Sequence, residues 1–387
     1  MTDNADRLST GMAAHANEPP EQISPVHAAS PRLVSLDALR GFDMFWIVGG
    51  AELAAGLAEW TDWPLFHWIT TQTVHVEWNG FTFWDLIFPL FLFIAGVAMP
   101  LSLHKRLERG ESKATLYGHV CRRGLMLVFL GLVVNGLLLF DFANLRYPSV
   151  LGRIGLGYLF GAIIVLNTRA RGQILWTIGI LLGYWAAMNW IPVPGYGAGD
   201  LTPGHTLADY IDRMLLPGKL YEGVRDPEGL LSTVPAIATA LLGALAGQWL
   251  SLPNRSGHQK AAGLLLAGGL FLGLGQLWNL SYPINKNLWS SSFVLYAGGW
   301  SFLALGIFYW VIDVCGWQRW SFFFRVIGMN AITIYIATDF INFDGVGELL
   351  FANAQQEVHA TLLASSGLLL RWLMLYAMYR QKLFLRV

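Results

Sequence analysis

Charged residues are scarce in this sequence, where Asp, Glu, Lys and Arg make up only 13% of the 387 residues. A typical soluble domain carries about a quarter of its residues as charges. Hydrophobic residues make up 55% of the chain, which is more than a water-soluble core can bury. The shortage of charge therefore excludes an ordinary soluble protein. Since 25 basic residues balance 25 acidic ones, no overall electrostatic field favours nucleic acid as a partner.

Cysteine is almost missing, with only Cys121 and Cys315 in the chain. Two distant cysteines form neither a disulfide framework nor a metal-binding knuckle, so we expect both to serve packing and we expect no metal site. The sequence also lacks a G-x-x-x-x-G-K phosphate loop. Residues 1–30 lack the apolar region of a secretory signal, and their Ala, Pro, Glu and Ser content predicts a disordered cytoplasmic tail.

Long apolar runs fill the rest of the chain. Each is close to the length of about 20 residues with which a helix crosses a bilayer. We therefore predict an all-α fold, a polytopic bundle of membrane helices that forms one transmembrane domain over 31–387. About ten crossings are expected, at 36–57, 83–103, 124–140, 151–166, 174–191, 230–250, 261–280, 291–315, 320–340 and 360–379.

The distribution of Lys and Arg predicts the orientation of this bundle. The segments 58–82 and 341–359 contain neither residue, whereas the loop 104–123 contains six and the C-terminus three more. Positive residues near helix ends are retained in the cytoplasm. Both termini are therefore expected in the cytoplasm, and the long Gly- and Pro-rich loop 192–229 is expected on the far, periplasmic side.

Two pairs of small residues, in GALAG (243–247) and GLFLG (269–273), have the spacing that allows close contact between membrane helices. Ionisable residues inside the crossings are costly and therefore informative. The first crossing carries Asp37, Arg40 and Asp43, spaced so that Arg40 can pair with either carboxylate. A structural ion pair explains this group as well as a functional site does.

The stretch HVEWNG, residues 75–80, brings His75, Glu77 and Asn79 to the far-side start of the second crossing, where Asp85 follows. A histidine titrates near neutral pH, a carboxylate can orient it, and an amide can stabilise an oxyanion. A solvated loop histidine is the alternative. A second polar group, Asn285, Lys286 and Asn287, opens the eighth crossing as an interfacial anchor or as a hydrogen-bonding site for a polar ligand.

Six separated blocks resemble the heparan-α-glucosaminide N-acetyltransferase family, specifically its bacterial members. They follow in order from about residue 31 onward, and they read RLVSLDALRGFDM, HVEWNGFTFWDLIFPLFLFIAGVAMPLS, RYPSVLGRIGLGYLF, DPEGLLSTVPAI, PINKNLWSSSFVL and GMNAITIYI. The resemblance implies an acetyltransferase of the bacterial inner membrane, assembled as a homodimer. It would move acetyl from cytoplasmic acetyl-CoA to the amine of a glucosamine-type sugar on the periplasmic side.

The resemblance also assigns residues. His75 is the family's active histidine, and we expect it to act as general base. The animal enzyme has an asparagine near the far end of the first crossing, whereas Glu52 is the nearest polar residue here. Asn79 or a backbone N–H near Gly80 would stabilise the oxyanion, and Asp85 or Glu52 would orient the imidazole or hold the ammonium of the sugar. An acetyl-histidine intermediate is the alternative to direct transfer, which we favour.

The two substrates need binding groups of different kinds. Arg40, Arg122 and Arg123 are expected to neutralise the phosphates of acetyl-CoA, unless the last two serve orientation alone. A sugar amine would be held by polar and aromatic side chains of the far face. For this role we select Trp78, Arg146, Arg153, Asn285, Lys286 and Asn287. The competing function is an inner-membrane amino-sugar transporter, although the sequence shows no inverted repeat that would favour it.

Overall fold

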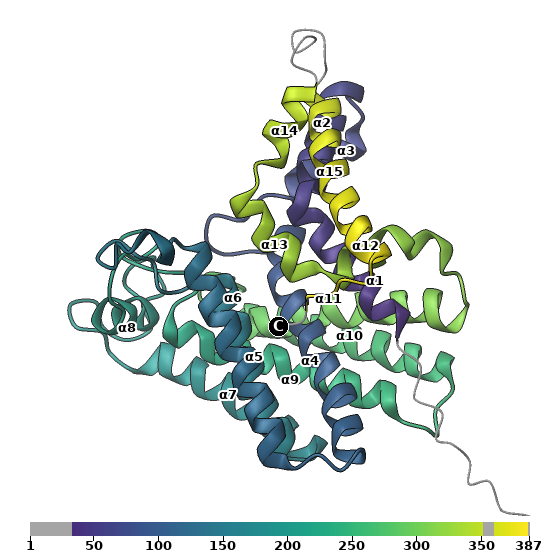
Figure 1. Cartoon of the computed structure of the whole chain (residues 1–387). Helices are drawn as coiled ribbons and strands as arrows, with labels where there is room; N and C mark the ends of the chain where they lie inside the picture. The colour runs from purple at the N-terminus through teal and green to yellow at the C-terminus, as the bar shows by residue number, and fades with distance from the viewer. Residues whose placement is uncertain (1–32, 351–359, 386–387) are drawn as a thin grey trace, which may run out of the picture. The chain divides into compact units, whose positions relative to one another are not determined.

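The computed structural model describes residues 33–350 and 360–385, and Val34 begins one compact unit that contains all the helices (Figure 1). Within these ranges every regular element is a helix, apart from two isolated β-bridges. The expected tail 1–30 lies outside the described residues. The helices are α1 (Val34–Phe45), η1 (Trp46–Gly50), α2 (Ala51–Thr61), α3 (Pro64–Gln72), α4 (Phe83–Glu108), α5 (Lys113–Val134), η2 (Leu137–Leu139), α6 (Val150–Asn167), α7 (Ala170–Trp190), α8 (Leu207–Leu215), α9 (Leu230–Ser251), α10 (Gly257–Asn279), α11 (Ser291–Tyr309), η3 (Trp310–Val314), η4 (Arg319–Ser321), α12 (Phe322–Met329), α13 (Ala331–Phe340), α14 (Phe343–Leu350) and α15 (Ala360–Arg380).

Among the described residues, seven helices are long and apolar enough to cross a membrane: α4, α5, α6, α9, α10, α11 with η3, and α15. The pair formed by η4–α12 and α13 makes an eighth if its two parts, bent by 61°, count as one broken span. The all-α membrane bundle is thus confirmed. The predicted crossings at 36–57 and 174–191 are helical, as α1–α2 and α7, but they are not among these candidates. The count of ten and the placement of the termini stay predictions.

The first predicted crossing is not one straight helix. A π-helical turn, η1, joins α1 to α2, and within it Val48 and Gly49 leave helical geometry. Gly49 adopts a φ of +131°, which a side-chain-bearing residue rarely tolerates. Beyond this break α2 packs against α3 and α15, at the end of the bundle that is uppermost in Figure 1. The break separates Met44 and Ile47 from the exposed Glu52. Met44 and Ile47 line a cavity that is described below with the candidate active site.

Helix α4 is a central element, because most of its length is buried against α9, α6 and α11. Glycines of α9 allow the closest approach: a Cβ on Gly243 would collide with the carbonyl oxygen of Phe93, and one on Gly247 with that of Val97. The close contact predicted for GALAG is therefore confirmed. The same prediction for GLFLG is wrong, because a Cβ on Gly269 or Gly273 would meet open space. In α10 it is Gly268 and Gly275 that touch α11.

The other intramembrane charges predicted from the sequence are mostly paired. Arg40 lies 3.7 Å from Asp37, as one of the two predicted pairings requires. Asp43 is fully buried, and no described residue forms a hydrogen bond to its carboxylate. Arg371 of α15 donates to Asp344 of α14 at 2.9 Å. Both helices of this ion pair belong to the same end of the bundle as α2 and α3.

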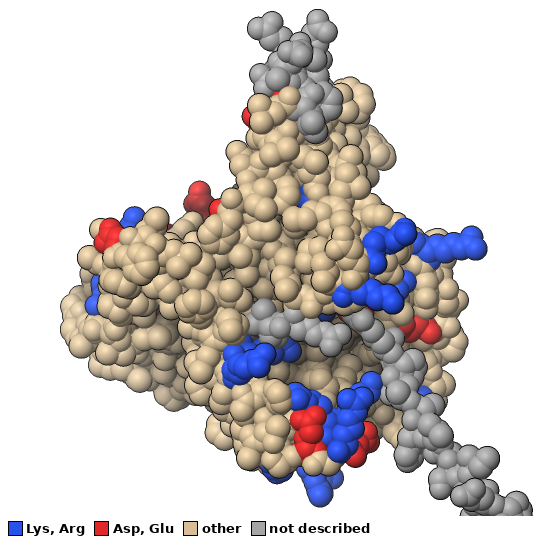
Figure 2. Space-filling model, viewed as in Figure 1, with Lys and Arg blue, Asp and Glu red and all other residues tan. Residues whose placement is uncertain are grey.

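Lys and Arg are unevenly spread over the face drawn in Figure 2. They gather toward the turn between α4 and α5 and toward α12, whereas the end formed by α2, α3, α14 and α15 is almost free of them. The same segregation of positive charge led to the predicted orientation, with the loop between α4 and α5 in the cytoplasm.

Candidate active site

The residues that carry chemistry begin at the N-terminus of α4. Thr82 is the N-cap residue, and a capping box links it to Asp85 three positions later. The Asp85 Oδ2 atom accepts hydrogen bonds from the backbone N–H of Thr82 at 3.0 Å and from its hydroxyl at 3.1 Å. The Asp85 side chain is only 1% exposed. The local sequence thus fixes a buried carboxylate at the head of α4, with its second oxygen left for another partner.

His75 is that partner. Its Nδ1 lies 2.7 Å from Asp85 Oδ1. A carboxylate can only accept, so Nδ1 carries the hydrogen and the neutral imidazole presents an unprotonated Nε2. The His75 side chain is 47% exposed, whereas the carboxylate that orients it is buried. This arrangement holds the ring in the tautomer whose Nε2 carries no hydrogen and can accept one.

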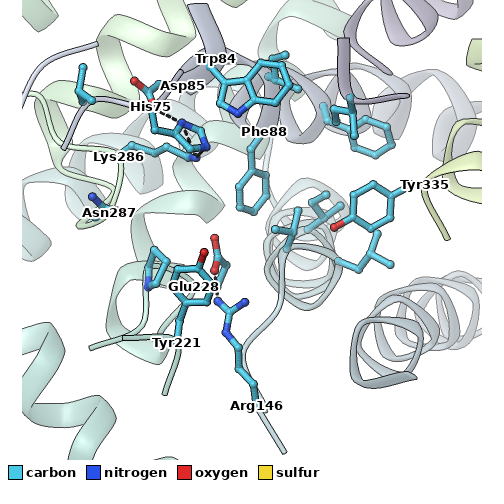
Figure 3. A pocket seen from close by; sticks show the side chains of 18 of the residues that line it. His75, Trp84, Asp85, Phe88, Arg146, Tyr221, Glu228, Lys286, Asn287 and Tyr335 are labelled. Atoms are coloured by element: carbon cyan, nitrogen blue, oxygen red, sulfur yellow. Dashed lines mark hydrogen bonds and ion pairs between the residues drawn. The ribbon is translucent and has the colours of Figure 1, made fainter. Parts of the chain in front are cut away.

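Lys286 reaches the same imidazole from the loop between α10 and α11. Its Nζ lies 2.9 Å from His75 Nε2 and 3.3 Å from Nδ1. Burial lowers the pKa of Lys286, and the nearby carboxylates of Asp85 and Glu228 partly oppose that shift. A partly buried amine, an imidazole and a carboxylate therefore form one continuous group, drawn in Figure 3.

Two loops far apart in the sequence are tied together to build this group. The N–H of Gly80 donates to the carbonyl oxygen of Ile284 at 2.9 Å, and Asn285 Nδ2 donates to Asn79 Oδ1 at 3.1 Å. The other end of the Asn285 amide accepts from the Leu288 N–H at 2.9 Å. Asn285 is fully buried. Its role is to fasten the Lys286 loop to the His75 loop.

The group opens into a cavity of about 420 Å³, a volume within the usual range for small-molecule sites. The wall opposite His75 in Figure 3 carries Arg146, Tyr221 and Glu228. Arg146 donates to Asp226 at 2.7 and 2.8 Å and also to Glu228, and its guanidinium lies 4.7 Å from the Tyr221 ring centre. Burial opposes the charge of Arg146, but the two carboxylates prevail and raise its pKa.

A second ion pair borders the cavity. Arg225 donates to Glu222 at 2.6 Å, and both residues line the cavity. Trp78 lies behind Arg225, with its ring centre 4.5 Å from the guanidinium, and its indole N–H donates to the Leu201 carbonyl at 2.9 Å. Trp78 therefore supports the loop 192–229 instead of facing the cavity.

The structure brings five of the predicted site residues together around the cavity. They are His75, Asp85, Arg146, Lys286 and Asn287. They come from three blocks of the sequence, so the association of the HVEWNG, RYPSV and PINKN motifs with one site holds in three dimensions. The apolar part of the lining comes mainly from α4 and α6, including Trp84, Phe88 and Leu151.

The other predicted residues do not line the cavity. Arg153 is buried in α6, where it donates to Ser232 and lies over the Trp289 ring at 4.9 Å. Glu52 is exposed on α2, and Asn79 is exposed while bonded to Asn285. Their expected contacts with a sugar, an imidazole or an oxyanion receive no support from these positions. The arginines expected to bind acetyl-CoA lie on α1 and α5: Arg40, Arg122 and Arg123.

Sequence reasoning missed the wall opposite His75. Glu228 and Tyr221 were not selected, although DPEG was quoted as a motif and Glu228 stands just before a crossing, as Asp85 does. That position was the available signal. Glu77, considered as an orienting carboxylate, lines the cavity, while Asp85 makes the contact to the imidazole.

Known proteins resemble the chain over most of its length. Residues 32–136 match a family model described as a domain of unknown function, DUF5009. Heparan-alpha-glucosaminide N-acetyltransferase of Homo sapiens is 30% identical over 93% of this chain, and that of Mus musculus is 31% identical over 81%. The chain spans 60% of the human protein and 56% of the mouse protein. It is thus a relative of the heparan-α-glucosaminide N-acetyltransferases, the family that its motif blocks predict.

Proposed function

We propose that this protein is a membrane N-acetyltransferase that moves acetyl from acetyl-CoA to the amine of a glucosamine-type sugar. The observation that carries the proposal is the contact of His75 with the buried Asp85, at the wall of a cavity large enough for a small ligand. The chain that holds this pair is a relative of two N-acetyltransferases. The resemblance extends the proposal to a bacterial inner membrane, a periplasmic acceptor and a homodimer.

His75 is the general base of the proposed reaction. An amine attacks a thioester only after losing a proton, and His75 Nε2 is the unprotonated nitrogen that faces the cavity. Asp85 holds the tautomer in which Nε2 carries no hydrogen, and it stabilises the imidazolium once the proton has arrived. Because the carboxylate is buried and the imidazole is half exposed, the pair resembles the orienting and reacting members of a catalytic triad.

The cavity favours a cationic acceptor over an anionic one. Four carboxylates line it, those of Glu77, Asp85, Glu222 and Glu228. Arg146 pairs with Glu228 and Arg225 with Glu222, while Lys286, the third cation of the lining, contacts His75, which Asp85 holds. Glu77 forms no ion pair with a described residue, so its carboxylate would repel a sulfated saccharide and attract a protonated amino sugar. We propose free glucosamine or a short glucosamine-terminated saccharide as the acceptor.

The exposed face of Tyr221 gives the sugar ring a surface to pack on. Arg146 covers one face of the ring, and the side chain lines the cavity opposite His75. Pyranose rings present C–H groups that pack against such apolar aromatic faces. Tyr221 and Glu228 would then orient the sugar so that its amine points toward His75.

Acetyl-CoA would reach this group from the cytoplasmic side, with Arg40, Arg122 and Arg123 as its phosphate partners. We propose direct transfer from the thioester to the amine. The test is a quenched reaction with radiolabelled acetyl-CoA and no acceptor. Direct transfer predicts no label on the protein, and label that stays on His75 through denaturation would establish an acetyl-histidine intermediate instead.

The proposed activity is tested by incubating the purified, reconstituted protein with acetyl-CoA and either glucosamine or N-acetylglucosamine. We expect acetylation of glucosamine only, together with release of one free thiol per acetyl group transferred. The comparison uses vesicles that contain the protein but no acetyl-CoA. Radiolabelled glucosamine is added outside them, and its uptake is measured. Accumulation of unmodified sugar without any acetylation in the first assay would support the transporter and overturn the acetyltransferase.

A further inference from the structure

We propose that Lys286 is a catalytic residue of the acetyl transfer, whose Nζ donates a hydrogen bond to the thioester oxygen as negative charge develops there. This inference rests on the proposed function. Lys286 was expected only as an anchor or as a ligand of the sugar, and the geometry points to the reacting carbonyl.

The position of Nζ limits what it can touch during the reaction. It lies 2.9 Å from His75 Nε2, the atom that takes the proton of the amine. In a reactive complex the amine nitrogen must bond to Nε2 and must also lie about 3–3.5 Å from the carbonyl carbon. The carbonyl oxygen is then confined to the immediate surroundings of Nε2. A donor acts on an oxyanion at about 2.7–3.1 Å. When the amine takes its place at Nε2, Nζ has to leave that nitrogen, and the carbonyl oxygen is the acceptor next to it.

The backbone that carries Lys286 is rigid. The Trp289 N–H donates to the Lys286 carbonyl at 3.0 Å and the Ser290 N–H to the Asn285 carbonyl at 3.1 Å, which closes a tight turn. Trp289 is fully buried at a positive φ of 51°, a conformation that the surrounding contacts must hold in place. A donor mounted on such a turn needs little reorganisation when charge develops.

The two donors first expected at the oxyanion, Asn79 and the Gly80 N–H, do not line the cavity. The Gly80 N–H donates to Ile284, and the Asn79 side chain is exposed, with its Oδ1 accepting from Asn285. Lys286 differs from Arg146 and Arg225, the other cations of the cavity lining, because no described carboxylate oxygen forms an ion pair with it. Its recorded contact is the imidazole. In the described part of the site, Lys286 is the cation available to an oxyanion.

The step balances without a further reactant. The nitrogen lone pair of the acceptor forms the N–C bond while the carbonyl π electrons move to oxygen, where Nζ–H donates to the oxyanion. The amine proton passes to His75 Nε2. The tetrahedral intermediate then collapses, the C–S bond breaks with its electron pair on sulfur, and the imidazolium returns the proton to that sulfur as the thiol of CoA.

The test compares the kinetics of Lys286→Met and Lys286→Arg with those of the wild type, using acetyl-CoA and glucosamine. Loss of one oxyanion donor lowers kcat by about 10²–10³-fold. We expect this loss in Lys286→Met, with the KM for glucosamine changed little. Lys219→Met is the matched control, because Lys219 is an exposed lysine of a far-side loop that does not line the cavity. It should retain wild-type kinetics.

The pH profile distinguishes a catalytic ammonium from a structural lysine. Lys286 faces His75, Asp85 and Glu228, with Arg153 further away, and its own deprotonation should produce a decline in kcat at alkaline pH, below the 10.5 of an ordinary lysine. A guanidinium does not titrate in this range. In Lys286→Arg we expect a partly retained kcat, with the alkaline decline shifted to higher pH.

Three outcomes overturn the inference. A wild-type kcat in Lys286→Met shows that no ammonium is needed, and a raised KM with unchanged kcat assigns Lys286 to sugar binding. An alkaline decline at the same pH in Lys286→Arg removes the titrating lysine from the reaction, even if the methionine variant fails to fold. A wild-type protein that acetylates no amino sugar instead rejects the proposed function itself, and the inference with it.

Discussion

Asp85 acts in two contacts at once, because its two carboxylate oxygens face different partners. One oxygen closes the capping box with Thr82, and the other holds His75 Nδ1. The turn that starts α4 thereby also sets the orientation of the base. The sequence analysis did not predict this capping box, and it left Asp85 and Glu52 as alternatives for orienting the imidazole. The structure favours Asp85 through its 2.7 Å contact.

Asp85→Asn should lower kcat by about 10²–10⁴-fold, since an amide can hold the imidazole in the wrong tautomer and cannot stabilise the imidazolium. Steady-state acetylation of glucosamine measures this loss. Glu59→Gln, on exposed α2, is the control and should keep full activity. An Asp85→Asn enzyme within a factor of three of wild type would remove the orienting role from our account.

The burial of Asp212 leads to a prediction about how the stability of the protein depends on pH. This buried residue of α8 accepts from the Leu230 N–H at 2.8 Å, and no described residue forms a hydrogen bond to its Oδ2. Burial raises its pKa to about 7, from 3.8. A raised pKa stabilises the folded state fully at pH values below the pKa of the unfolded chain. This stabilisation is lost as the pH rises to the pKa of the folded protein.

The thermal midpoint of the wild type should therefore fall as the pH rises from about 4 to about 7, by an amount equivalent to about 1.4 kcal/mol for each unit of pKa difference. Asp212→Asn removes the titration and keeps an acceptor for Leu230, so its midpoint should vary much less over this interval. Thermal unfolding of both proteins in detergent at several pH values measures the difference. Parallel curves would show that Asp212 does not titrate in this window.

Site residues from a single block were easier to predict than those that depend on contacts between blocks. His75 and Asp85 lie ten positions apart beside one helix start, and both were selected. The wall formed by Tyr221 and Glu228 was not, because the loop before α9 meets the loop before α4 only through tertiary packing. Burial was equally invisible: Arg153 was chosen for the sugar, yet α9 and Trp289 enclose it.

At the scale of the elements, hydropathy predicted the helices well and their interruptions poorly. Each of the ten predicted ranges is largely helical where the structure describes it. The turn at Gly49 went unnoticed, because a π-helical break leaves the apolar pattern of α1 and α2 continuous. The bend between α12 and α13, which lies at Asn330, was also missed.

Two glycines, one in contact with a neighbouring helix and one not, allow a matched test of how the helices pack. Gly243→Ala should lower the thermal midpoint and the yield of folded protein, because its Cβ would collide with the Phe93 backbone and would push α9 away from α4. Gly269→Ala meets open space and should be neutral or slightly stabilising, since alanine is favoured over glycine in a helix by about 1 kcal/mol. Equal midpoints for the two variants would contradict the close packing of α4 on α9.

For the whole molecule, the orientation in the membrane remains the main prediction that rests on sequence. Charge counting places the loop 58–82 on the far side and the loop 104–123 in the cytoplasm. Helices alone cannot decide this, because reversing the bundle leaves every internal contact unchanged. Figure 2 shows the segregation of Lys and Arg from which this orientation is predicted.

Cysteine labelling of intact cells tests this orientation. Glu59→Cys, at an exposed far-side position, should react with an impermeant maleimide added outside, whereas Lys113→Cys should react only after the membrane is opened. The native Cys315 is also exposed and predicted to be cytoplasmic, so it should give no external label. External labelling of Lys113→Cys with protection of Glu59→Cys would reverse the topology and the side on which the sugar is modified.

The central claim is that His75 removes the proton of an amino sugar during acetyl transfer. The most direct measurement is the single-turnover formation of N-acetylglucosamine from acetyl-CoA and glucosamine by wild type and His75→Ala at neutral pH. We predict that the variant still folds, because the His75 side chain is 47% exposed, and that it reacts about 10²–10⁴-fold more slowly. A His75→Ala enzyme that forms the product at the wild-type rate would contradict the account.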